Sequence, residues 1–282
     1  MEIIRIPRIM QDTAWGHLLR GRTIGFVPTM GALHAGHLSL VRMSREENNI
    51  TAVSIYVNPT QFGPSEDFTK YPRPIEADIE RLRKEAVDIL FLPDDALMYP
   101  TGFSTEIEVK GLSERMCGQF RPSHFKGVAT VVAKLFSVVR PTRAYFGQKD
   151  FQQTVLIRKM AKDLNLDIDI IVCPTVREED GLALSSRNAY LNREQRSAAI
   201  VLYRSLSEAA DAIRSGIRSG AKIRQVMRTM LEKEMQITAI DYASVYHIDT
   251  LEDMEDLQGE VLLAGAVRMS GTRLIDNMLV TV

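Results

Sequence analysis

The segment Thr23–Leu40 constrains the fold of this chain more than any other part of its sequence. A short apolar run around Phe26 predicts a buried strand. The glycines Gly31 and Gly36 then indicate a turn, and an apolar helical pattern begins at Leu38. The segment therefore predicts a helix that leaves the end of a buried strand through a glycine-containing turn.

Two histidines, His34 and His37, lie three residues apart at the expected start of that helix. The first backbone N–H groups of a helix lack intrahelical acceptors, and the helix dipole is positive there, so the position attracts anions. The phosphates of a nucleotide are the natural occupant. Ordinary surface or core histidines are one alternative. A metal half-site is another, although no Cys, Glu or third His lies nearby in the sequence to complete it.

Strand-like and helix-like segments alternate through the first half of the chain. This alternation predicts an α/β, Rossmann-like, mostly parallel sheet with helices on both faces, and ligands at the carboxyl ends of its strands. Further strands are expected at residues 51–57, 88–92, 144–146 and 167–173, and helices at 75–86, 124–139 and 151–164.

The pattern changes after Asn192, which forms a capping-box-like helix start with Gln195. A long helix is expected to end near Gly216 and Gly220, and a second helix and three strand-like segments follow. Helices followed by strands indicate a smaller α+β domain. We therefore expect a nucleotide-binding domain over residues 1–175 and a C-terminal domain over residues 176–282.

Composition limits the classes of partner. The chain has 282 residues and a formal net charge of −1, which argues against a nucleic-acid-binding surface. Cys117 and Cys173 form no disulfide framework, and the N-terminus does not resemble a signal peptide. The apolar stretch 128–139 is interrupted by Lys134 and is too short to span a bilayer. We expect a soluble cytoplasmic protein with no nucleic-acid or membrane partner.

Three other segments carry polar residues, and each segment follows an expected strand or lies in a loop beyond one. Asn58 and Gln61 offer amides that suit a small polar substrate, although an ordinary Asn-Pro turn would look the same. Lys149 stands at a helix start, where it suits a phosphate oxygen, and the neighbouring Asp150 suits a helix cap; a surface lysine beside a cap is the alternative. The loop 184–188 places two hydroxyls beside a guanidinium, as in a phosphate clamp or in a plain solvated loop.

The motif His34-Ala35-Gly36-His37 resembles the HxGH signature of the nucleotidyltransferase superfamily, and the longer string from Pro28 to His37 resembles the pantothenate synthetase family. The resemblance implies ATP, pantoate and β-alanine as substrates, Mg²⁺ held mainly by the phosphates with no protein ligand assigned, and a homodimer. The implied catalytic residues are His34, His37, Lys149, Ser185 and Arg187. The implied ATP-binding residues are Met30, Gly31, Ala32, Leu33, His34, Ala35, Gly36, His37, Gly147, Gln148, Lys149, Asp150, Val176, Leu184, Ser185, Ser186 and Arg187. The implied residues for pantoate and β-alanine are Asn58, Gln61 and Gln153.

The same resemblance implies a two-step reaction. The pantoate carboxylate attacks the α-phosphorus of ATP and releases pyrophosphate, and the amine of β-alanine then attacks the bound pantoyl adenylate and releases AMP. His37 is expected to donate a proton, and the cluster of Arg121, Ser123 and His124 is expected close to the site. Two other hypotheses remain open: an HxGH enzyme that ends with a stable adenylylated product, and a non-catalytic ATP-binding module.

Overall fold

The computed structural model describes residues 1–64 and 66–282, which form two compact units. The first unit contains Met1–Ser113, Arg121–Gly147 and Gln153–Pro174. The second unit contains Glu114–Phe120, Gln148–Gln152 and Thr175–Val282. Two short segments that precede residue 175 in the sequence therefore belong to the second unit. The domain boundary expected at residues 175 and 176 stays a prediction.

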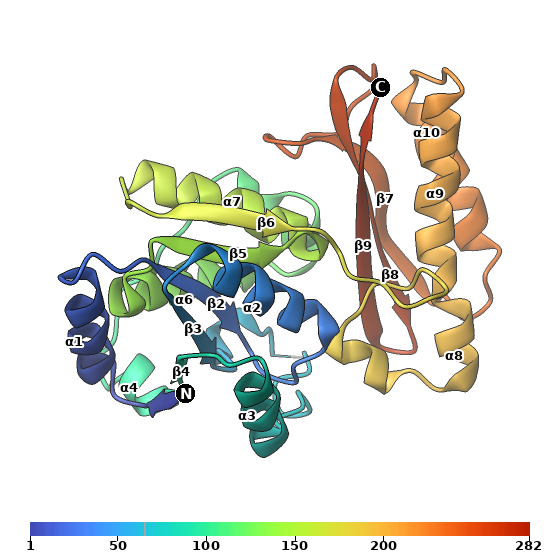
Figure 1. The fold of residues 1–282 in the computed structure, drawn as a ribbon. Coiled ribbons are helices and arrows are strands. Elements are labelled where there is room, and N and C mark those ends of the chain that lie inside the picture. The colour runs from blue at the N-terminus through green and yellow to red at the C-terminus, as the bar shows by residue number, and fades with distance from the viewer. Residues whose placement is uncertain (65) are drawn as a thin grey trace. The chain divides into compact units, whose positions relative to one another are not determined.

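The first unit is built on a parallel sheet, which confirms the expected fold class (Figure 1). Among the described residues the strand order is β1-β4-β3-β2-β5-β6, and every neighbouring pair is parallel. The strands are β1 (Glu2–Ile4), β2 (Ile24–Thr29), β3 (Ile50–Ile55), β4 (Ile89–Phe91), β5 (Arg143–Gly147) and β6 (Asp169–Cys173). The expected strands are confirmed with shifts of one or two residues at their ends, whereas β1 was not expected.

Helices cover both faces of this sheet. The helices α2 (Ala35–Glu47) and α3 (Ile75–Lys84) pack on one face, in an apolar cluster that includes Leu40, Leu82 and Tyr145. Phe146 follows Tyr145 along β5 and so points to the opposite face, where its ring meets Phe136 of α6. The remaining helices of the first unit include α1 (Pro7–Leu18), α4 (Asp95–Met98), α6 (His124–Val139) and most of α7 (Phe151–Asp163).

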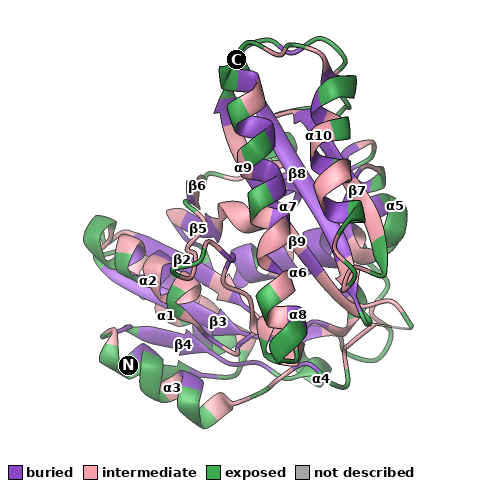
Figure 2. Ribbon diagram, turned by 90° about the vertical axis from the view of Figure 1, so that its right-hand side faces the viewer, coloured by how far each residue is buried: buried purple, intermediate pink, exposed green. Residues whose placement is uncertain are grey.

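The second unit contains an antiparallel sheet in the order β7-β8-β9, covered by helices (Figure 1). Its strands are β7 (Ala239–His247), β8 (Glu260–Met269) and β9 (Thr272–Thr281), and its helices include α5 (Cys117–Phe120), α8 (Arg193–Ala198), α9 (Ile200–Arg214) and α10 (Gly220–Glu232). The central strand β8 is buried along nearly its whole length (Figure 2). Its side chains share one apolar core with residues of α9 and α10.

The start of the helical region is as expected, but its course differs. Asn192 and Gln195 form the expected capping box, with the Gln195 N–H donating to Asn192 Oδ1 at 2.9 Å. The single long helix expected after it is interrupted at Ala199, where the N–H of Leu202 donates to the Ala199 carbonyl in a tighter i to i−3 turn. Among the described residues, no helix combines the length and apolar character that a membrane span requires.

One ion pair inside the second unit supports a prediction about its stability. Arg177 binds both carboxylate oxygens of the buried Asp276 on β9, at 2.6 and 2.9 Å. Replacing Arg177 by Ala leaves a buried carboxylate uncompensated, so we expect a loss of about 3 kcal/mol of unfolding free energy. Replacing Arg214, whose pair with Asp211 is exposed, should cost below about 1 kcal/mol. Urea unfolding, with hydrogen exchange of the β8 and β9 amides to locate the change, measures both; equal effects would contradict this account.

Candidate active site

The two histidines cap the helix that follows β2. His34 is the N-cap of α2, and its Nδ1 accepts the N–H of Gly36 at 3.2 Å. The N–H of His34 donates in turn to Nδ1 of His37 at 3.3 Å, which completes a capping box made of two imidazoles. Because each Nδ1 acts as an acceptor, the proton of each neutral ring lies on Nε2. The histidine pair therefore presents Nε2–H groups as its hydrogen-bond donors.

The loop before the histidines does not offer the free amides expected from the sequence. The N–H of Gly31 donates to Thr29 Oγ1 at 3.1 Å. The N–H groups of Ala32 and Leu33 donate to the two carboxylate oxygens of Asp78, at 2.7 and 2.9 Å. The expectation of free amides is thus wrong for these residues, and also for His34 and Gly36, because acceptors within the protein already bind them.

Asp78 is a site residue that the sequence analysis missed. It lies on α3, is fully buried, and belongs to the same helix face as Ile75, Ile79 and Leu82. Burial raises the pKa of its carboxyl group above the usual value, and the two amide hydrogen bonds and Arg81 offset this only in part. An acidic residue at an apolar position of an amphipathic helix was the signal in the sequence.

The second predicted segment forms a short 3-10 turn, η1 (Pro59–Gln61), after β3. Asn58 is almost fully buried, and its amide donates to the Gly127 carbonyl at 3.1 Å and to Gln61 Oε1 at 3.3 Å. Its own Oδ1 accepts the hydroxyl of Thr60 at 3.0 Å. The amide of Gln61 donates to the sulfur of Met30. The structure thus brings Met30 and Gln61 together, with Asn58 as the support of the turn.

Two residues of the cluster expected near the site, Arg121 and His124, bind the main chain of this turn. His124 Nδ1 lies 2.9 Å from the carbonyl oxygen of Gln61, and Arg121 Nη2 donates to the same oxygen at 3.3 Å. Arg121 also binds the carboxylate of Glu66. Burial would raise the pKa of Glu66, but the hydrogen bonds and charge of Arg121 hold it below the usual value. Arg121 and His124 therefore position the main chain of Gln61.

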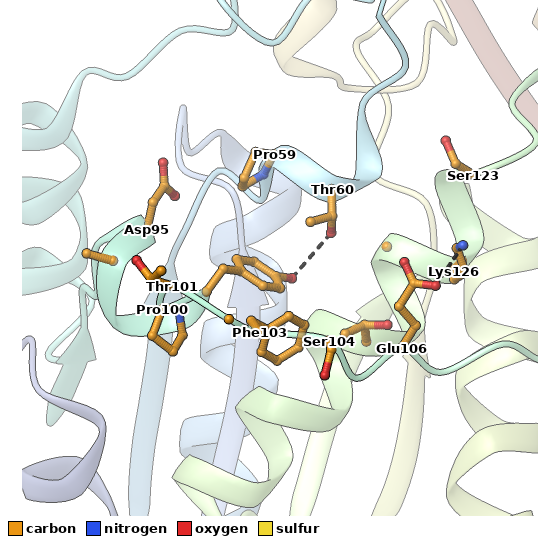
Figure 3. Close-up of a pocket in the computed structure, with 15 residues that line it drawn as sticks. Pro59, Thr60, Asp95, Pro100, Thr101, Phe103, Ser104, Glu106, Ser123 and Lys126 are labelled. Carbon is orange, nitrogen blue, oxygen red and sulfur yellow. Dashed lines mark hydrogen bonds and ion pairs between the residues drawn. The ribbon is translucent and has the colours of Figure 1, made fainter.

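Helix α6 approaches the turn so closely that only glycine fits at residue 127. A Cβ atom built there would lie 2.4 Å from the Thr60 carbonyl oxygen and 2.7 Å from the Gln61 nitrogen. On one side of the turn lies a cavity of about 1050 Å³, lined among others by Pro59, Thr60 and Tyr99. The hydroxyl of Thr60, which is labelled in Figure 3, lies 3.3 Å from the hydroxyl of Tyr99.

The third predicted segment begins with Gly147, the last residue of β5, and continues through a 3-10 turn, η3 (Gln148–Asp150). The turn belongs to the second unit, where Asn277 of β9 donates to the carbonyl oxygens of Gln148 and Lys149 at 3.0 and 2.9 Å. Asn277 therefore fixes the main chain that carries Lys149, a contact that the sequence analysis missed. Two consecutive polar residues, 276 and 277, inside an apolar strand were the signal.

The fourth segment lies in an ordered loop of the second unit. The N–H of Leu184 donates to the Val176 carbonyl at 3.0 Å, which joins two residues predicted for the nucleotide. Ser185 caps the 3-10 turn η4 (Ser186–Tyr190), and its hydroxyl accepts the N–H of Arg187 at 3.3 Å. The structure therefore holds Val176, Leu184, Ser185, Ser186 and Arg187 in one local framework.

The remaining predicted residues are placed as follows. Ala35 is the first residue of α2, and Gln153 lies in the first turn of α7 in the first unit. Within the described part of the chain, no group of three or more His, Cys, Asp or Glu side chains is arranged to hold a metal ion. The histidine pair therefore gains no third protein ligand from these residues.

The chain is similar over its whole length to proteins of one family. The family model described as pantoate-beta-alanine ligase matches residues 2–279. The pantothenate synthetase of Thermodesulfovibrio yellowstonii is 53% identical over 280 residues, covering 99% of this chain and 100% of the relative. That of Acetivibrio thermocellus is 53% identical over 262 residues, covering 93% of each chain.

Solved structures agree with the sequence matches. The pantothenate synthetase of Thermus thermophilus superposes with a TM-score of 0.94 at 43% identity, covering 99% of both chains. The pantoate-beta-alanine ligase of Francisella tularensis, solved with beta-gamma ATP and beta-alanine, superposes with a TM-score of 0.79 at 35% identity, covering 99% of this chain and 97% of that one. The expected family is confirmed: the chain belongs to the pantoate–β-alanine ligases, the pantothenate synthetases, and is a ligase that forms an amide bond.

Proposed function

We propose that this ligase condenses pantoate with β-alanine through an enzyme-bound pantoyl adenylate, with ATP as the activating substrate. The observation that carries the proposal is the pair of imidazoles that cap α2 at the turn after β2, each with its Nδ1 accepting a main-chain N–H. The Francisella tularensis relative, solved with a nucleotide and β-alanine, supports the choice of substrates.

In the proposed first step, a carboxylate oxygen of pantoate attacks the α-phosphorus of ATP. The bond from that phosphorus to the bridging oxygen breaks, and pyrophosphate leaves with the electron pair. In the second step, the amine of β-alanine attacks the acyl carbon of the adenylate, the acyl–oxygen bond breaks, and AMP leaves while the amine loses a proton. Charge develops on phosphate oxygens, so fixed donors and alignment of the reactants supply the catalysis.

We assign His34 and His37 to hydrogen-bond donation toward the triphosphate. Each Nδ1 already accepts a main-chain N–H, so protonation of Nδ1 would break the capping box. The ring centroids are 4.1 Å apart, and two charged rings at that distance would repel each other. The neutral rings with Nε2–H donors therefore suit the free enzyme, and His37 is assigned to the oxygen that departs with pyrophosphate.

The residues of the second unit are assigned by their chemistry. Lys149 supplies a compact cation for phosphate oxygens, and Ser185, Ser186 and Arg187 supply hydroxyls and a guanidinium for the same anion. Gly147, Gln148, Asp150, Val176 and Leu184 are assigned to the nucleotide on the family resemblance, together with Met30, Gly31, Ala32, Leu33, Ala35 and Gly36.

Gln61 and Gln153 are assigned to the hydroxyl and carboxylate groups of pantoate. Asn58 has a different part, because both its amide group and its Oδ1 are used inside the protein. We infer that it orients Gln61, with which it shares a hydrogen bond. Its contribution to substrate recognition then passes through the position of that glutamine.

Mg²⁺ should accompany ATP. We propose that this ion is held mainly by the phosphates and by water, as Mg²⁺ prefers. The ion would neutralise part of the phosphate charge. On the family resemblance we also propose a homodimer, which sedimentation equilibrium would test.

The proposal is tested by measuring pyrophosphate and AMP with each substrate omitted in turn. We expect pyrophosphate release to require ATP and pantoate, and AMP release to require β-alanine as well. Pyrophosphate release with phosphopantetheine or nicotinamide mononucleotide in place of pantoate would instead favour an adenylyltransferase. Nucleotide binding without turnover would indicate a non-catalytic module.

The geometry of His37 predicts different results for two substitutions. In His37→Asn, the side-chain amide lies near the former Nδ1 and can keep the helix cap, but nothing replaces Nε2. We expect roughly a 10²–10³-fold loss of pyrophosphate release. In His37→Gln, the amide reaches the former Nε2 position, so the loss should be clearly smaller. Single-turnover measurements compare them, and the reverse order would contradict the assignment of Nε2–H as the donor.

The approach of α6 to the turn predicts an effect on pantoate alone. In Gly127→Ala the new methyl group meets main-chain atoms of Thr60 and Gln61, so the turn must move. A shift of that size should lower kcat/KM for pantoate by roughly 10²-fold. Nucleotide affinity, measured by calorimetry with a non-hydrolysable analogue, should stay unchanged. Gly16→Ala, in α1, is the matched control because its Cβ meets only Arg20 Nη1 at 3.6 Å; equal kinetics for the two variants would exclude this role for residue 127.

A further inference from the structure

The carboxylate of Asp78 holds the loop that leads to the two histidines. Asp78 lies 45 and 46 residues beyond the two amides that it binds, on a different helix, and is fully buried. Its two oxygens accept one N–H each, from Ala32 and from Leu33.

The loop acts as an anion-binding nest, because the successive N–H groups of Ala32 and Leu33 bind one carboxylate. Gly31 and Ala32, at the turn that leads to these groups, both have positive φ, at 85° and 49°. Ala32 is not a glycine, so its left-handed conformation is unfavourable unless other contacts hold it. Here the nest is filled by a carboxylate of the protein itself. The loop is therefore locked before any substrate binds.

Arg81, one turn further along α3, completes the arrangement. Its guanidinium donates to the Leu33 carbonyl, and its Nη1 lies 3.6 Å from Asp78 Oδ1. The N–H and the C=O of Leu33 are thus both held from α3. The next residue is His34, whose main-chain N–H is bound by His37. The contacts from α3 therefore fix the main chain of Leu33, and through it they fix the position of both imidazoles.

Asp78 is as buried as a core residue. Leu33, which it binds, and Leu82, one turn along α3, both belong to the buried apolar cluster on this face of the sheet. An apolar side chain of similar size would satisfy such a position at no cost in desolvation, whereas a carboxylate there is expensive. The charge is explained by the two amides that it binds, and not by packing.

We propose that Asp78, with Arg81, is the positioning residue for the two histidines in nucleotide activation. The inference rests on the function proposed above, in which these histidines act on ATP. Asp78 has no contact with substrate in this account. It acts by keeping the loop in its left-handed conformation, with its amides turned inward, so that imidazole side chains rather than main-chain amides bind the phosphates.

The test is Asp78→Asn, which keeps the volume but replaces one acceptor oxygen with a donor that faces an N–H. We expect folded protein in which kcat/KM for ATP falls roughly 10²-fold while KM for β-alanine changes less than about twofold. A merely structural role would reduce the folded fraction without this separation of the two substrates. Folded Asp78→Asn with unchanged kcat/KM for ATP would overturn the proposal.

Imidazole ¹⁵N spectra of the chain's five histidines provide a readout that does not depend on turnover. In the unaltered enzyme His34 and His37 should show the Nε2–H tautomer, and Asp78→Asn should change these two signals and leave His17 and His247 unchanged. Unchanged signals of His34 and His37 would also overturn the proposal. If unaltered enzyme releases no pyrophosphate, the proposed function fails, while the spectra still decide whether Asp78 positions the histidines.

A second substitution covers the case in which Asp78→Asn does not fold. Arg81→Gln leaves the carboxylate and its two amide hydrogen bonds in place, and it removes the guanidinium that donates to the Leu33 carbonyl and lies 3.6 Å from Asp78 Oδ1. We expect roughly a tenfold loss in kcat/KM for ATP and a smaller change in the same two histidine signals. Wild-type kinetics together with wild-type spectra for this variant would overturn the inference that α3 positions the two histidines through Leu33.

Discussion

The parallel pairing of β2 with its two neighbours is the constraint on which the candidate site depends. The register aligns Thr29 with Ile55 at the ends of β2 and β3, while β5 pairs with β2 on its other side. Chains that leave parallel strands at their carboxyl ends emerge at one edge of the sheet. The loop to the histidines and the turn with Gln61 therefore start side by side, and the contact between Met30 and Gln61 follows from that register. Without this alignment the two segments, more than 20 residues apart, would have no reason to meet.

At that edge of the sheet, the main-chain amides of the loop already donate hydrogen bonds to groups of the protein itself. A glycine turn at a helix start normally offers its N–H groups to a phosphate. Here the Asp78 carboxylate, the Thr29 hydroxyl and the two histidine rings accept hydrogen bonds from those N–H groups. The positive potential of the loop is consequently offset by a negative charge of the protein. Recognition of a polyanion must then rely on side chains, which is consistent with a motif that places two imidazoles at this point.

The sequence predicted elements whose signals are local. The helix α6 and the capping box at Asn192 were found because apolar periodicity and cap residues lie within a few positions of each other. The pairing of Asp78 with Ala32 and of Asn277 with Lys149 could not be found that way, because those partners are 46 and 128 residues apart. The premise of free amides failed for the same reason: an acceptor from a distant helix fills the nest. The role of Gly127, inside the helix expected over residues 124–139, could not be predicted either, since only the folded chain shows that the turn at Thr60 lies against it.

Three contacts made by buried polar residues share one arrangement. In the first unit a buried carboxylate binds the main chain next to His34, and a buried amide, Asn58, binds the side chain of Gln61. In the second unit a buried amide, Asn277, binds the main chain of Lys149. Each such residue is buried, and burial of a polar group is unfavourable unless its partners are fixed. The side chains assigned to chemistry therefore do not need to hold themselves in place. They are oriented by polar residues of the core, so substitutions far from any substrate can alter the reaction more than they alter the fold.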